Sequence, residues 1–325
     1  MVAHAQEERR YDVVVVGGGA AGLSGALALV RARRSVLVID DGRPRNVMAD
    51  RTHNFLTRDG MPPGELLAAG RAEVAGYGGE FVSDEAVAAE PQEGSGFRVL
   101  LAAGPPVAGR RLLVTTGLVD ELPEVPGMAE RWGRDVLHCP YCHGWEARDR
   151  AIAVLATGPL ACRQALMWRQ WSTDVTLLLH ASPEPGSEEH ERLAARGIAI
   201  VPGRVAGLEV ADGALAGVRL ADGRRVPCQA LVVEPRFTAR AGLCASLGLS
   251  AEVERSAGEA VGSSVPAAGS GATDVPGVWV AGNITSLSDQ VIGAAAAGVQ
   301  AAQAINSDLV DEDTRLAVAN RRGSG

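Results

Sequence analysis

The first patterned segment of the chain is an apolar, β-branched run that ends in glycines. Residues Tyr11–Val16 form this run, and its lack of polar alternation predicts a parallel strand buried on both faces. Apolar side chains then recur at i, i+3, i+4 and i+7 from Leu23 to Val30, which predicts a helix. Ser35–Ile39 is again short and β-branched, so we expect one strand-helix-strand unit.

A second unit of the same kind follows in the middle of the chain. The second unit is expected to consist of strand 151–155, helix 161–171 and strand 175–179. Between the two units we expect a helix at 63–76 and short strands at 97–101 and 111–114. Alternation of strands and helices in two places predicts an α/β fold with two Rossmann-like, three-layer nucleotide-binding domains.

Two segments lack such a pattern. Residues Glu252–Thr273 are rich in Gly, Ser and Ala with little periodicity, and Asp311–Gly325 has the composition of a frayed tail. We assign no chemistry to either segment.

Composition narrows the functional class. A chain of 325 residues with 46% hydrophobic side chains suits two domains of common size. Because 31 Lys and Arg face 39 Asp and Glu, giving a net charge of −8, we expect no nucleic-acid partner. Residues 1–10 lack an apolar leader and no apolar run is long enough for a bilayer, so we expect a cytoplasmic protein without membrane contact.

The glycines after the first strand form a GxGxxG motif, Gly17 to Gly22. Gly17 permits the turn, Gly19 admits a pyrophosphate, and Gly22 allows close packing, with Ala20 and Ala21 at the start of the helix that faces the phosphates. Asp40 follows the second strand, 18 residues after Gly22, where a carboxylate accepts hydrogen bonds from ribose hydroxyls. The alternative is a Gly-rich turn that binds no ligand. The motif alone also does not show whether the ligand is FAD or NAD.

The most informative stretch is a CxxC motif, Cys139 to Cys142. At the start of a helix this spacing brings two sulfurs close enough for a disulfide, and helix amides favour the thiolate. Zinc is the alternative, but a closed zinc site needs four ligands, and Cys162, Cys228 and Cys244 form no second pair, so we expect no metal. Glutaredoxins use the same tetrapeptide, but early in a small fold rather than between two nucleotide-domain patterns.

Near the far end, residues Thr273–Asn283 resemble the second flavin fingerprint of the pyridine nucleotide-disulfide oxidoreductases. Two flavin fingerprints flanking a CxxC domain resemble the low-molecular-weight thioredoxin reductases over nearly the whole chain. The resemblance implies a discontinuous FAD-binding domain of residues 1–117 and 245–325, and an inserted NAD(P)H-like domain of residues 118–244 that carries the CxxC.

The resemblance also implies where FAD is held. It assigns Gly282 and Asn283 to the flavin ribityl chain, although the family usually has Asp at the second position; an amide still bonds a hydroxyl. Asp289–Ile305 is an Ala-rich helix, with Gln290 and Val291 expected beside the isoalloxazine; an ordinary core helix is the alternative. The other residues assigned to FAD are Asp41, Arg45, Asn46, Asn54, Val87, Thr116 and Gly117.

Catalytic roles follow from the same resemblance. Cys142 resembles the sulfur that faces flavin C4a, and Cys139 resembles the interchange sulfur that reacts with substrate. His143 stands where the family has an acid/base aspartate, and an imidazole can exchange protons with thiols near neutral pH. The alternative for His143 is a packed or surface histidine, and His138 is more typical of a structural residue.

The second unit departs from the family's NADPH site. Residues Ala156–Ala161 contain one glycine and a proline where the backbone must approach a pyrophosphate, and His180–Pro185 is locally acidic where a 2′-phosphate needs basic residues. The nucleotide motif is therefore degenerate and NADPH binding is doubtful.

The combination of Cys-Pro-Tyr-Cys-His-Gly-Trp-Glu, Gly-Asn and an eroded NADPH site resembles the FAD-dependent dithiol oxidases of the gliotoxin and holomycin type. Residues 53–60 resemble this subgroup too. The resemblance implies that a small-molecule dithiol is oxidised to a disulfide, with electrons passing through FAD to O2 to give H2O2, in a homodimer. The alternatives are a thioredoxin reductase that acts on a thioredoxin-like protein with electrons from NADPH, ferredoxin or another donor, and a FAD-binding redox sensor without turnover.

Overall fold

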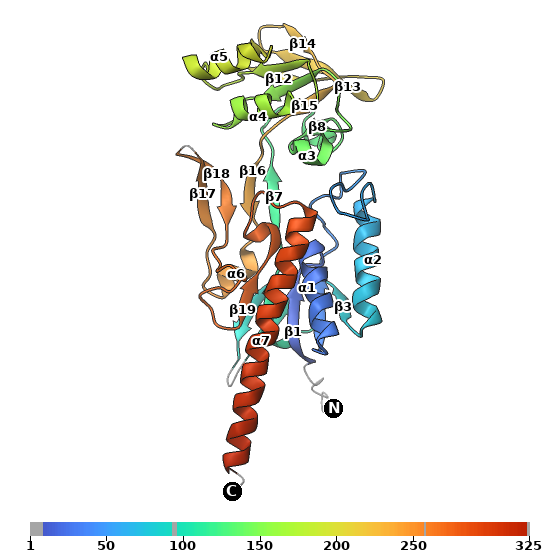
Figure 1. The fold of residues 1–325 in the computed structure, drawn as a ribbon, viewed down its shortest axis with the longest axis vertical. Coiled ribbons are helices and arrows are strands. Elements are labelled where there is room, and N and C mark those ends of the chain that lie inside the picture. Colours follow the sequence, from blue (N-terminus) through green and yellow to red (C-terminus); the bar gives the residue numbers. More distant parts are fainter. Residues whose placement is uncertain (1–8, 93–95, 257, 324–325) are drawn as a thin grey trace.

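The two strand-helix-strand patterns form a mixed sheet and a parallel sheet that lie one above the other along the long axis of the molecule (Figure 1). The structure is a computed structural model and describes residues 9–92, 96–256 and 258–323. The expectation that the chain has no apolar leader concerns residues 1–10, and residues 1–8 of this segment lie outside the described residues. No helix in the described ranges is both long and apolar enough to cross a bilayer.

The larger sheet has the strand order β3-β2-β1-β6-β5-β4, with β19 also paired to β6. Its strands are β1 Arg10–Val16, β2 Val36–Asp40, β3 Glu80–Ser83, β4 Ala86–Pro91, β5 Phe97–Leu101, β6 Val107–Val114 and β19 Val278–Val280. On β1, Val14 and Val16 pack into one core while Val13 and Val15 pack into another. Burial of both faces explains why the strand lacks polar alternation.

Three helices flank the larger sheet: α1 Ala20–Arg31, α2 Pro63–Gly76 and α7 Val291–Gly323. Helices α1 and α7 approach closely because both present glycines at their contact. A Cβ on Gly298 would clash with the carbonyl oxygen of Ala21, and one on Gly25 would lie 3.0 Å from the carbonyl oxygen of Gly298. This contact fixes the N-terminus of α7 beside the glycine motif of α1.

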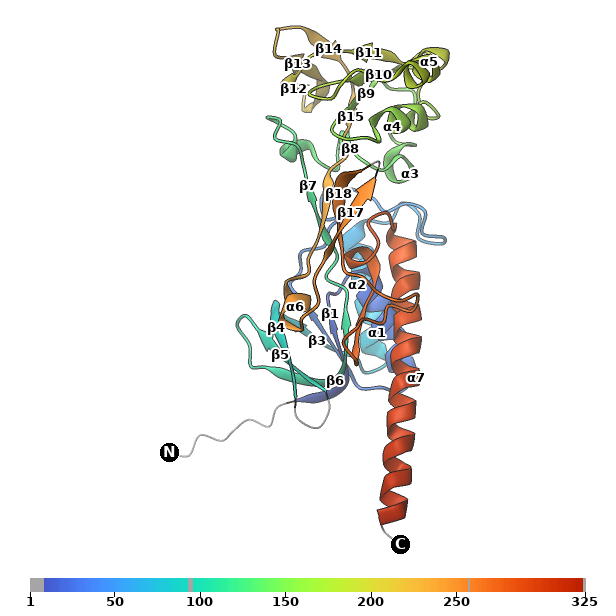
Figure 2. The ribbon, with the colours of Figure 1, turned by 90° about the vertical axis from the view of Figure 1, so that its left-hand side faces the viewer.

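The expectation of a frayed tail from Asp311 is wrong, because α7 continues to Gly323 (Figure 2). Its acidic side chains are held by arginines of the sheet: Arg110 lies 2.9 Å from Glu312 and 2.5 Å from Asp313, and Arg111 lies 2.5 Å from Asp308. These ion pairs fix the helix to the body as far as residue 313. Residues 324–325 of the predicted tail lie outside the described residues.

The smaller unit is built on a parallel sheet of order β11-β10-β9-β15-β8. Its strands are β8 Val136–Leu137, β9 Ile152–Leu155, β10 Val175–Leu178, β11 Ala199–Val201 and β15 Ala230–Val232. A three-stranded antiparallel sheet of β12 Val205–Ala211, β13 Ala214–Leu220 and β14 Arg225–Pro227 accompanies it. Its helices are α3 Pro140–His143, α4 Ala161–Trp168 and α5 Ser187–Ala195, with a 3-10 turn at Ala129–Arg131. The predicted helix 161–171 thus ends at Trp168.

A four-stranded sheet joins the two units, in the order β17-β18-β16-β7. The chain enters the smaller unit through β7 Leu118–Glu121 and leaves it through β16 Arg236–Ala239, and these two strands pair antiparallel. The remaining elements near it are β17 Glu252–Ser256, β18 Glu259–Ser264, α6 Gly242–Ser246 and a 3-10 turn at Gly282–Ile284. The α/β fold is confirmed, while the domain boundaries at 117/118 and 244/245 stay a prediction.

The expectation that 252–273 lacks a regular pattern is wrong for its first half, which forms the β17–β18 hairpin. Gly262 explains why the sequence of β18 lacks the apolar alternation from which a strand is predicted. A Cβ at this position would clash with the carbonyl oxygen of Phe237 on β16, so a glycine is required for the pairing of β18 with β16. The pairing therefore selects small residues rather than the alternating pattern of a half-buried strand.

Candidate active site

A cavity of about 1180 Å³ runs from the carboxyl ends of β1 and β2 to helix α3 in the smaller unit. Every predicted site residue lines it except Gly22, Asn54 and Gly282. The residues that do so are Gly17, Gly19, Ala20, Ala21, Asp40, Asp41, Arg45, Asn46, Val87, Thr116, Gly117, Cys139, Cys142, His143, Asn283, Gln290 and Val291. The tertiary structure thus gathers positions that are distant in sequence into one space.

The glycine motif has the shape that a dinucleotide requires. Gly17 has φ +104°, and a Cβ there would lie 2.5 Å from the carbonyl oxygen of Thr115. A Cβ on Gly22 would clash with the carbonyl oxygen of Gly17, so Gly22 serves packing. By contrast, a Cβ on Gly19 would meet no atom within 4 Å and would point into open space at the N-terminus of α1. This open approach to helix amides fits a pyrophosphate.

Asp40 ends β2 as predicted, but its carboxylate already has two protein partners. Oδ1 accepts a hydrogen bond of 2.9 Å from the Gly18 amide, and Oδ2 pairs with Arg71 of α2. Sequence reasoning missed both partners. Two sequence features could have indicated these partners: Gly18, the middle glycine of the motif, and Arg71, a basic residue on the helix that precedes β3.

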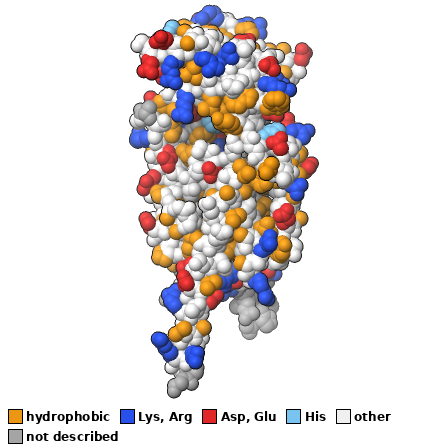
Figure 3. Space-filling view, in the orientation of Figure 1, with side chains coloured by type: hydrophobic (Ala, Val, Ile, Leu, Met, Phe, Trp, Pro, Cys, Tyr) orange, Lys and Arg blue, Asp and Glu red, His pale blue; other side chains and the backbone are white. Residues whose placement is uncertain are grey.

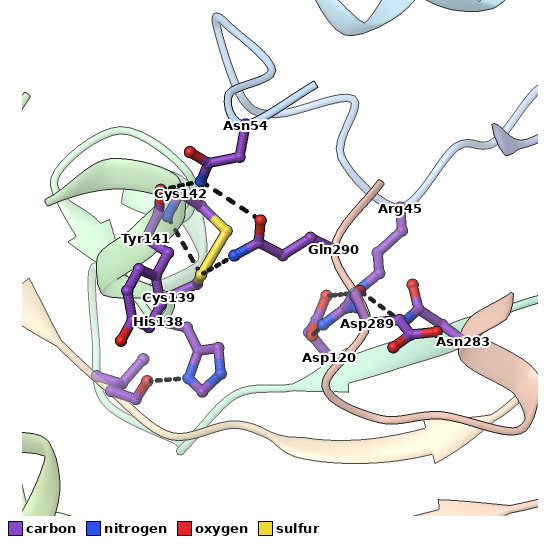
Figure 4. Close-up of a disulfide and its surroundings, with 11 residues drawn as sticks. Arg45, Asn54, Asp120, His138, Cys139, Tyr141, Cys142, Asn283, Asp289 and Gln290 are labelled. Atoms are coloured by element: carbon purple, nitrogen blue, oxygen red, sulfur yellow. Dashed lines mark hydrogen bonds and ion pairs between the residues drawn. A yellow bond between two sulfur atoms is a disulfide. The ribbon is translucent and has the colours of Figure 1, made fainter. Parts of the chain in front are cut away.

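Arg45 and Asn283 are also engaged in the protein. Arg45 makes a two-point ion pair with Asp120, at 2.9 Å from Nε to Oδ2 and 2.6 Å from Nη2 to Oδ1 (Figure 4). The Asn283 amide nitrogen donates to the carbonyl oxygens of Ser286 and Asp289, at 2.9 and 3.0 Å. An aspartate cannot donate these bonds. Asn283 therefore holds the loop that leads into α7 through donors that an aspartate at this position would lack.

The CxxC pair forms a disulfide at the start of α3, with a Cα–Cα distance of 5.2 Å. Cys139 is the N-cap residue and its sulfur accepts a 3.2 Å hydrogen bond from the Cys142 amide, while Pro140 occupies the first helical position. Among the described residues no group of three or more His, Cys, Asp or Glu side chains is placed to hold a metal ion. The disulfide favours redox chemistry at this pair over zinc binding.

The other cysteines are poor candidates for thiol chemistry. Burial raises the pKa of Cys228 to about 12 and that of Cys244 to about 11. The pKa of Cys162 is raised by burial and by the nearby Glu189. Since the thiolate is the reactive form, these three side chains remain protonated at neutral pH.

A loop of the larger unit, residues 52–61, reaches across to α3 (Figure 4). The Asn54 amide nitrogen donates to the carbonyl oxygen of Tyr141 at 2.7 Å and to Oε1 of Gln290 at 3.3 Å. Gln290 in turn points its Nε2 at the Cys139 sulfur, 4.0 Å away. Asn54 thus bridges the CxxC helix and the start of α7, and its contact with FAD stays a prediction.

His53, beside Asn54, extends the same bridge. Its Nδ1 lies 3.3 Å from Asp59 and its Nε2 lies 3.4 Å from Glu146, which follows α3. The backbone of Asn54 is left-handed, with φ +62°, and its amide donates to Asp59 at 2.9 Å. We call these contacts of His53, Asn54 and Gln290 with the α3 region the clamp, because they tie the disulfide to the larger unit.

His143 directly follows Cys142 and is half-buried. Burial lowers its pKa, an effect that Glu146 opposes and His53 reinforces. Its Nδ1 is buried without a hydrogen-bond partner. The imidazole is therefore neutral at pH 7 and can accept a proton. His138 instead packs edge-on against Phe237, with Nδ1 3.3 Å from the Val233 carbonyl oxygen, which fits a structural role.

The loop of residues 158–161 has the position of a second nucleotide motif, which the sequence predicts to be degenerate. Residues 158–161 form a turn in which the Ala161 amide donates to the Gly158 carbonyl oxygen at 3.3 Å, so this amide is not available to a phosphate. A Cβ on Gly158 would lie 3.9 Å from Oε2 of Glu234, whose pKa is raised by burial. Sequence reasoning missed Glu234; a carboxylate two residues after β15, at the carboxyl end of the sheet, was the available indication.

Apolar side chains lie exposed around the disulfide. Tyr141 and Trp145, on either side of His143, are 60% and 66% exposed, and Leu56 of the 52–61 loop is 82% exposed. Figure 3 shows hydrophobic side chains on both sides of the junction between the upper and lower parts of the molecule. Such a surface suits a substrate with an apolar body.

Comparison with known proteins agrees with this geometry. The pyridine nucleotide-disulphide oxidoreductase family matches residues 11–302. The chain belongs to this family. It is therefore an oxidoreductase of a family whose members carry a flavin, and the predicted resemblance to the thioredoxin reductases is confirmed.

Two curated relatives each match a little under half of this chain. The chain is 38% identical over 152 residues to thioredoxin reductase tcpT of Claviceps purpurea, covering 46% of this chain and 47% of that one. Thioredoxin reductase aclD of Aspergillus oryzae is 39% identical over 155 residues, 46% and 49% of the two chains. The match thus spans about half the length of these curated relatives.

Solved structures match along nearly the whole chain. The crystal structure of HlmI is 45% identical with a TM-score of 0.89 and covers 97% of both chains. That of an oxidoreductase from Agrobacterium tumefaciens is 33% identical with a TM-score of 0.86, covering 93% of this chain and 99% of the other. The two-unit architecture is therefore shared with proteins of the same family.

The clamp leads to a first prediction. Asn54→Asp keeps the size and tolerates the left-handed backbone, but it loses the donor to Tyr141 and places a carboxylate against a carbonyl oxygen. We expect electron transfer between the Cys139–Cys142 pair and the bound flavin to be about tenfold slower in anaerobic stopped-flow, with the melting temperature unchanged. Thr57→Asn, at another left-handed position of the loop, is the control. An unchanged rate in Asn54→Asp would show that the clamp does not position the disulfide.

Proposed function

We propose that this protein is a FAD-dependent dithiol oxidase that forms a disulfide in a small substrate dithiol. The observation that carries the proposal is one continuous cavity that joins the dinucleotide cradle at Gly19 to the Cys139–Cys142 disulfide. The second nucleotide site, in contrast, lacks a glycine cradle: its 158–161 turn contains Pro159, and the Ala161 amide donates to the Gly158 carbonyl oxygen rather than to a ligand. Electrons then enter through a thiol rather than through a nicotinamide.

The residues present fit FAD. Helix α1 offers its amides to the pyrophosphate over Gly19, Asp40 lies within reach of the ribose, and Asn283 and Gln290 lie where the flavin part would extend toward α3. When bound, FAD accepts the electron pair of the reduced cysteines and passes it to O2, which becomes H2O2. The remaining proposed assignments are Asp41, Arg45, Asn46, Val87, Thr116, Gly117 and Val291.

The cysteines carry the exchange with the substrate. One substrate thiolate attacks the Cys139 sulfur, the bond to Cys142 breaks, and Cys142 leaves as a thiolate. The second substrate thiol then displaces Cys139, so the substrate leaves as a disulfide and both cysteines are left reduced. His143 accepts a proton from the incoming thiol.

Anaerobic mixing tests this direction of electron flow. We expect dithiothreitol to bleach the flavin absorbance of the purified protein within the time of one catalytic turnover, whereas NADPH at the same concentration leaves the absorbance unchanged. In air, the dithiol should consume O2 and produce H2O2 in equal amounts. Bleaching by NADPH but not by any dithiol would contradict the proposal.

The second candidate is reduction of a thioredoxin-like protein, the reverse electron flow. It is favoured by the names of the curated relatives, which are thioredoxin reductases. The engaged Ala161 amide of the 158–161 turn and the Glu234 side chain near Gly158 argue against NADPH as its donor. If dithiols fail and reduced ferredoxin or another flavoprotein supports reduction of a thioredoxin, this candidate replaces the first. The predicted homodimer stays a prediction that sedimentation equilibrium can test.

The His143 imidazole predicts a pH dependence. Burial lowers its pKa below the ordinary value of 6.5, so the neutral base persists to lower pH and is lost only as the pH falls through that lowered pKa. We expect kcat/KM for dithiol to fall on an acidic limb below pH 6.5. In His143→Asn this limb should vanish, with about 10²-fold less activity at pH 7. His190→Asn, at an exposed position, is the control, and an acidic limb that survives in His143→Asn would exclude this role.

A further inference from the structure

Two side-chain amides in series connect the backbone of α3 to the sulfur of Cys139 (Figure 4). The Asn54 nitrogen Nδ2 donates to the carbonyl oxygen of Tyr141 at 2.7 Å and to Oε1 of Gln290 at 3.3 Å. The Gln290 nitrogen Nε2 points at the Cys139 sulfur from 4.0 Å. The series therefore ends on one sulfur of the redox disulfide.

The Tyr141 carbonyl oxygen sets the direction of this series, because a carbonyl oxygen can only accept hydrogen bonds. It requires the nitrogen of the Asn54 amide, rather than the oxygen, on the side of α3. The second N–H of that nitrogen meets Oε1 of Gln290, which leaves the Gln290 nitrogen to face the sulfur. The reversed amide would place an oxygen against the sulfur. Cys139 therefore meets a donor rather than an acceptor.

A second donor converges on the same sulfur. The backbone amide of Cys142 donates to the Cys139 sulfur at 3.2 Å, so both donors are directed at Cys139 rather than at Cys142. The sulfur of a disulfide is a weak acceptor, whereas a thiolate carries a full charge, and hydrogen bonds to charged groups are shorter and roughly twice as strong. The two donors therefore stabilise Cys139 as a thiolate more than they stabilise the disulfide.

The step that needs this thiolate is the release of the substrate. In the mixed disulfide, the Cys139 sulfur is bonded to one sulfur of the substrate. The second substrate thiol gives its proton to water and attacks that substrate sulfur. The bond to Cys139 breaks with its electron pair on Cys139, and a new S–S bond closes within the substrate. A thiol of lower pKa leaves faster in such an exchange, so donors at Cys139 accelerate the release.

We propose that Gln290 is a catalytic residue that stabilises the Cys139 thiolate as the oxidised substrate is released, and that Asn54 is a positioning residue that aims the Gln290 amide. The inference rests on the proposed function, because it assigns a step of the same reaction to these side chains. It gives the clamp a chemical role in addition to its structural one.

Titration of a single thiol tests the inference without turnover. Cys142→Ser leaves Cys139 as the one cysteine of the pair, and the rate at which iodoacetamide alkylates it follows its thiolate fraction. Mass spectrometry of the peptide that contains residue 139 separates this thiol from the other cysteines. In this background we expect Gln290→Leu to raise the pKa of Cys139 by about one unit, so that alkylation below the pKa slows about tenfold. Gln290→Glu, which places a carboxylate beside the thiolate, should raise the pKa further.

The other titratable side chains around the pair are the same in all the variants compared, so a difference between variants measures the Gln290 contact. These side chains are His53, His138, His143, Glu146 and Asp289. Gln303→Leu, at an exposed position of α7, is the matched control and should leave the titration unchanged. Asn54→Gly keeps the left-handed backbone but frees the Gln290 amide to turn, so it should raise the pKa of Cys139 by a smaller amount.

The outcomes separate this inference from the proposed function. If the pKa of Cys139 is the same in the Cys142→Ser parent and in both Gln290 variants, the inference is overturned even when the wild type oxidises dithiols. An equal rise in Gln303→Leu would also overturn it, because the cause would then be a general change in α7. Failure of every dithiol to bleach the flavin would instead overturn the proposed function, while a raised pKa in the Gln290 variants would still support the donor at Cys139.

Discussion

Cys139→Ser and Cys142→Ser are each expected to abolish dithiol oxidation while the flavin stays bound. A hydroxyl cannot form the disulfide, so neither variant can accept the electron pair of the substrate, and we expect a loss of at least about 10³-fold in turnover. The two variants should differ in one respect. If Cys139 is the interchange sulfur, the Cys139 thiolate of Cys142→Ser attacks a linear disulfide supplied as a probe, breaks its S–S bond and keeps one half as a mixed disulfide, while the other half leaves as a thiolate. Cys139→Ser does not form this adduct.

Oxygen uptake with a dithiol measures the loss of turnover, and mass spectrometry of the variants after treatment with the linear disulfide measures the difference between them. Cys162→Ser is the matched control, because this cysteine is half-buried with a raised pKa and lies outside the disulfide. Its activity should equal that of the wild type. Retained turnover in Cys142→Ser would exclude the disulfide as the carrier, and a mixed disulfide in Cys139→Ser alone would reverse the assigned roles.

Gly19→Val is expected to give a folded protein without flavin. The backbone of Gly19 is extended, with φ −79° and ψ −172°, so valine is allowed there, and its Cβ would meet no protein atom within 4 Å. The side chain would instead occupy the space over the α1 amides, where the pyrophosphate must approach. We expect the dissociation constant for FAD to rise at least about 10²-fold.

Absorbance of the purified protein and titration with FAD measure this effect, and circular dichroism checks the fold. Gly186→Val is a matched control, since Gly186 is also an extended N-cap glycine, with φ −60° and ψ 164°, and no atom lies within 4 Å of a Cβ placed on it. That variant should remain yellow. A yellow Gly19→Val protein with unchanged affinity would place the pyrophosphate elsewhere.

Local sequence was sufficient for the parts of the site that neighbouring residues build. The turn at Gly17, the helix after Gly19 and the disulfide at the start of α3 each depend on conformations within a few residues, so motif spacing predicted them. The same holds for the degenerate second motif, because a proline and a single glycine near 158 already exclude a phosphate cradle.

Other features depended on partners far away in the chain. Asn54 contacts Tyr141 at a separation of 87 residues, and Arg110 pairs with Glu312 at a separation of 202. From sequence alone, the acidic residues of α7 are typical of a solvated tail. Only the folded chain shows that arginines of β6 lie beside them, because the pattern of neither segment predicts its contact with the other.

The sequence by itself therefore determined the α/β class, the dinucleotide cradle and the redox disulfide, since these follow from backbone geometry and residue chemistry over short spans. Only the tertiary structure decided that one cavity joins the cradle to the disulfide, that His53 and Asn54 hold α3, and that Glu234 lies beside the 158–161 turn. The physical reason is that burial, ion pairing and unpaired polar atoms are properties of surroundings, and these surroundings are assembled from segments that are distant along the chain.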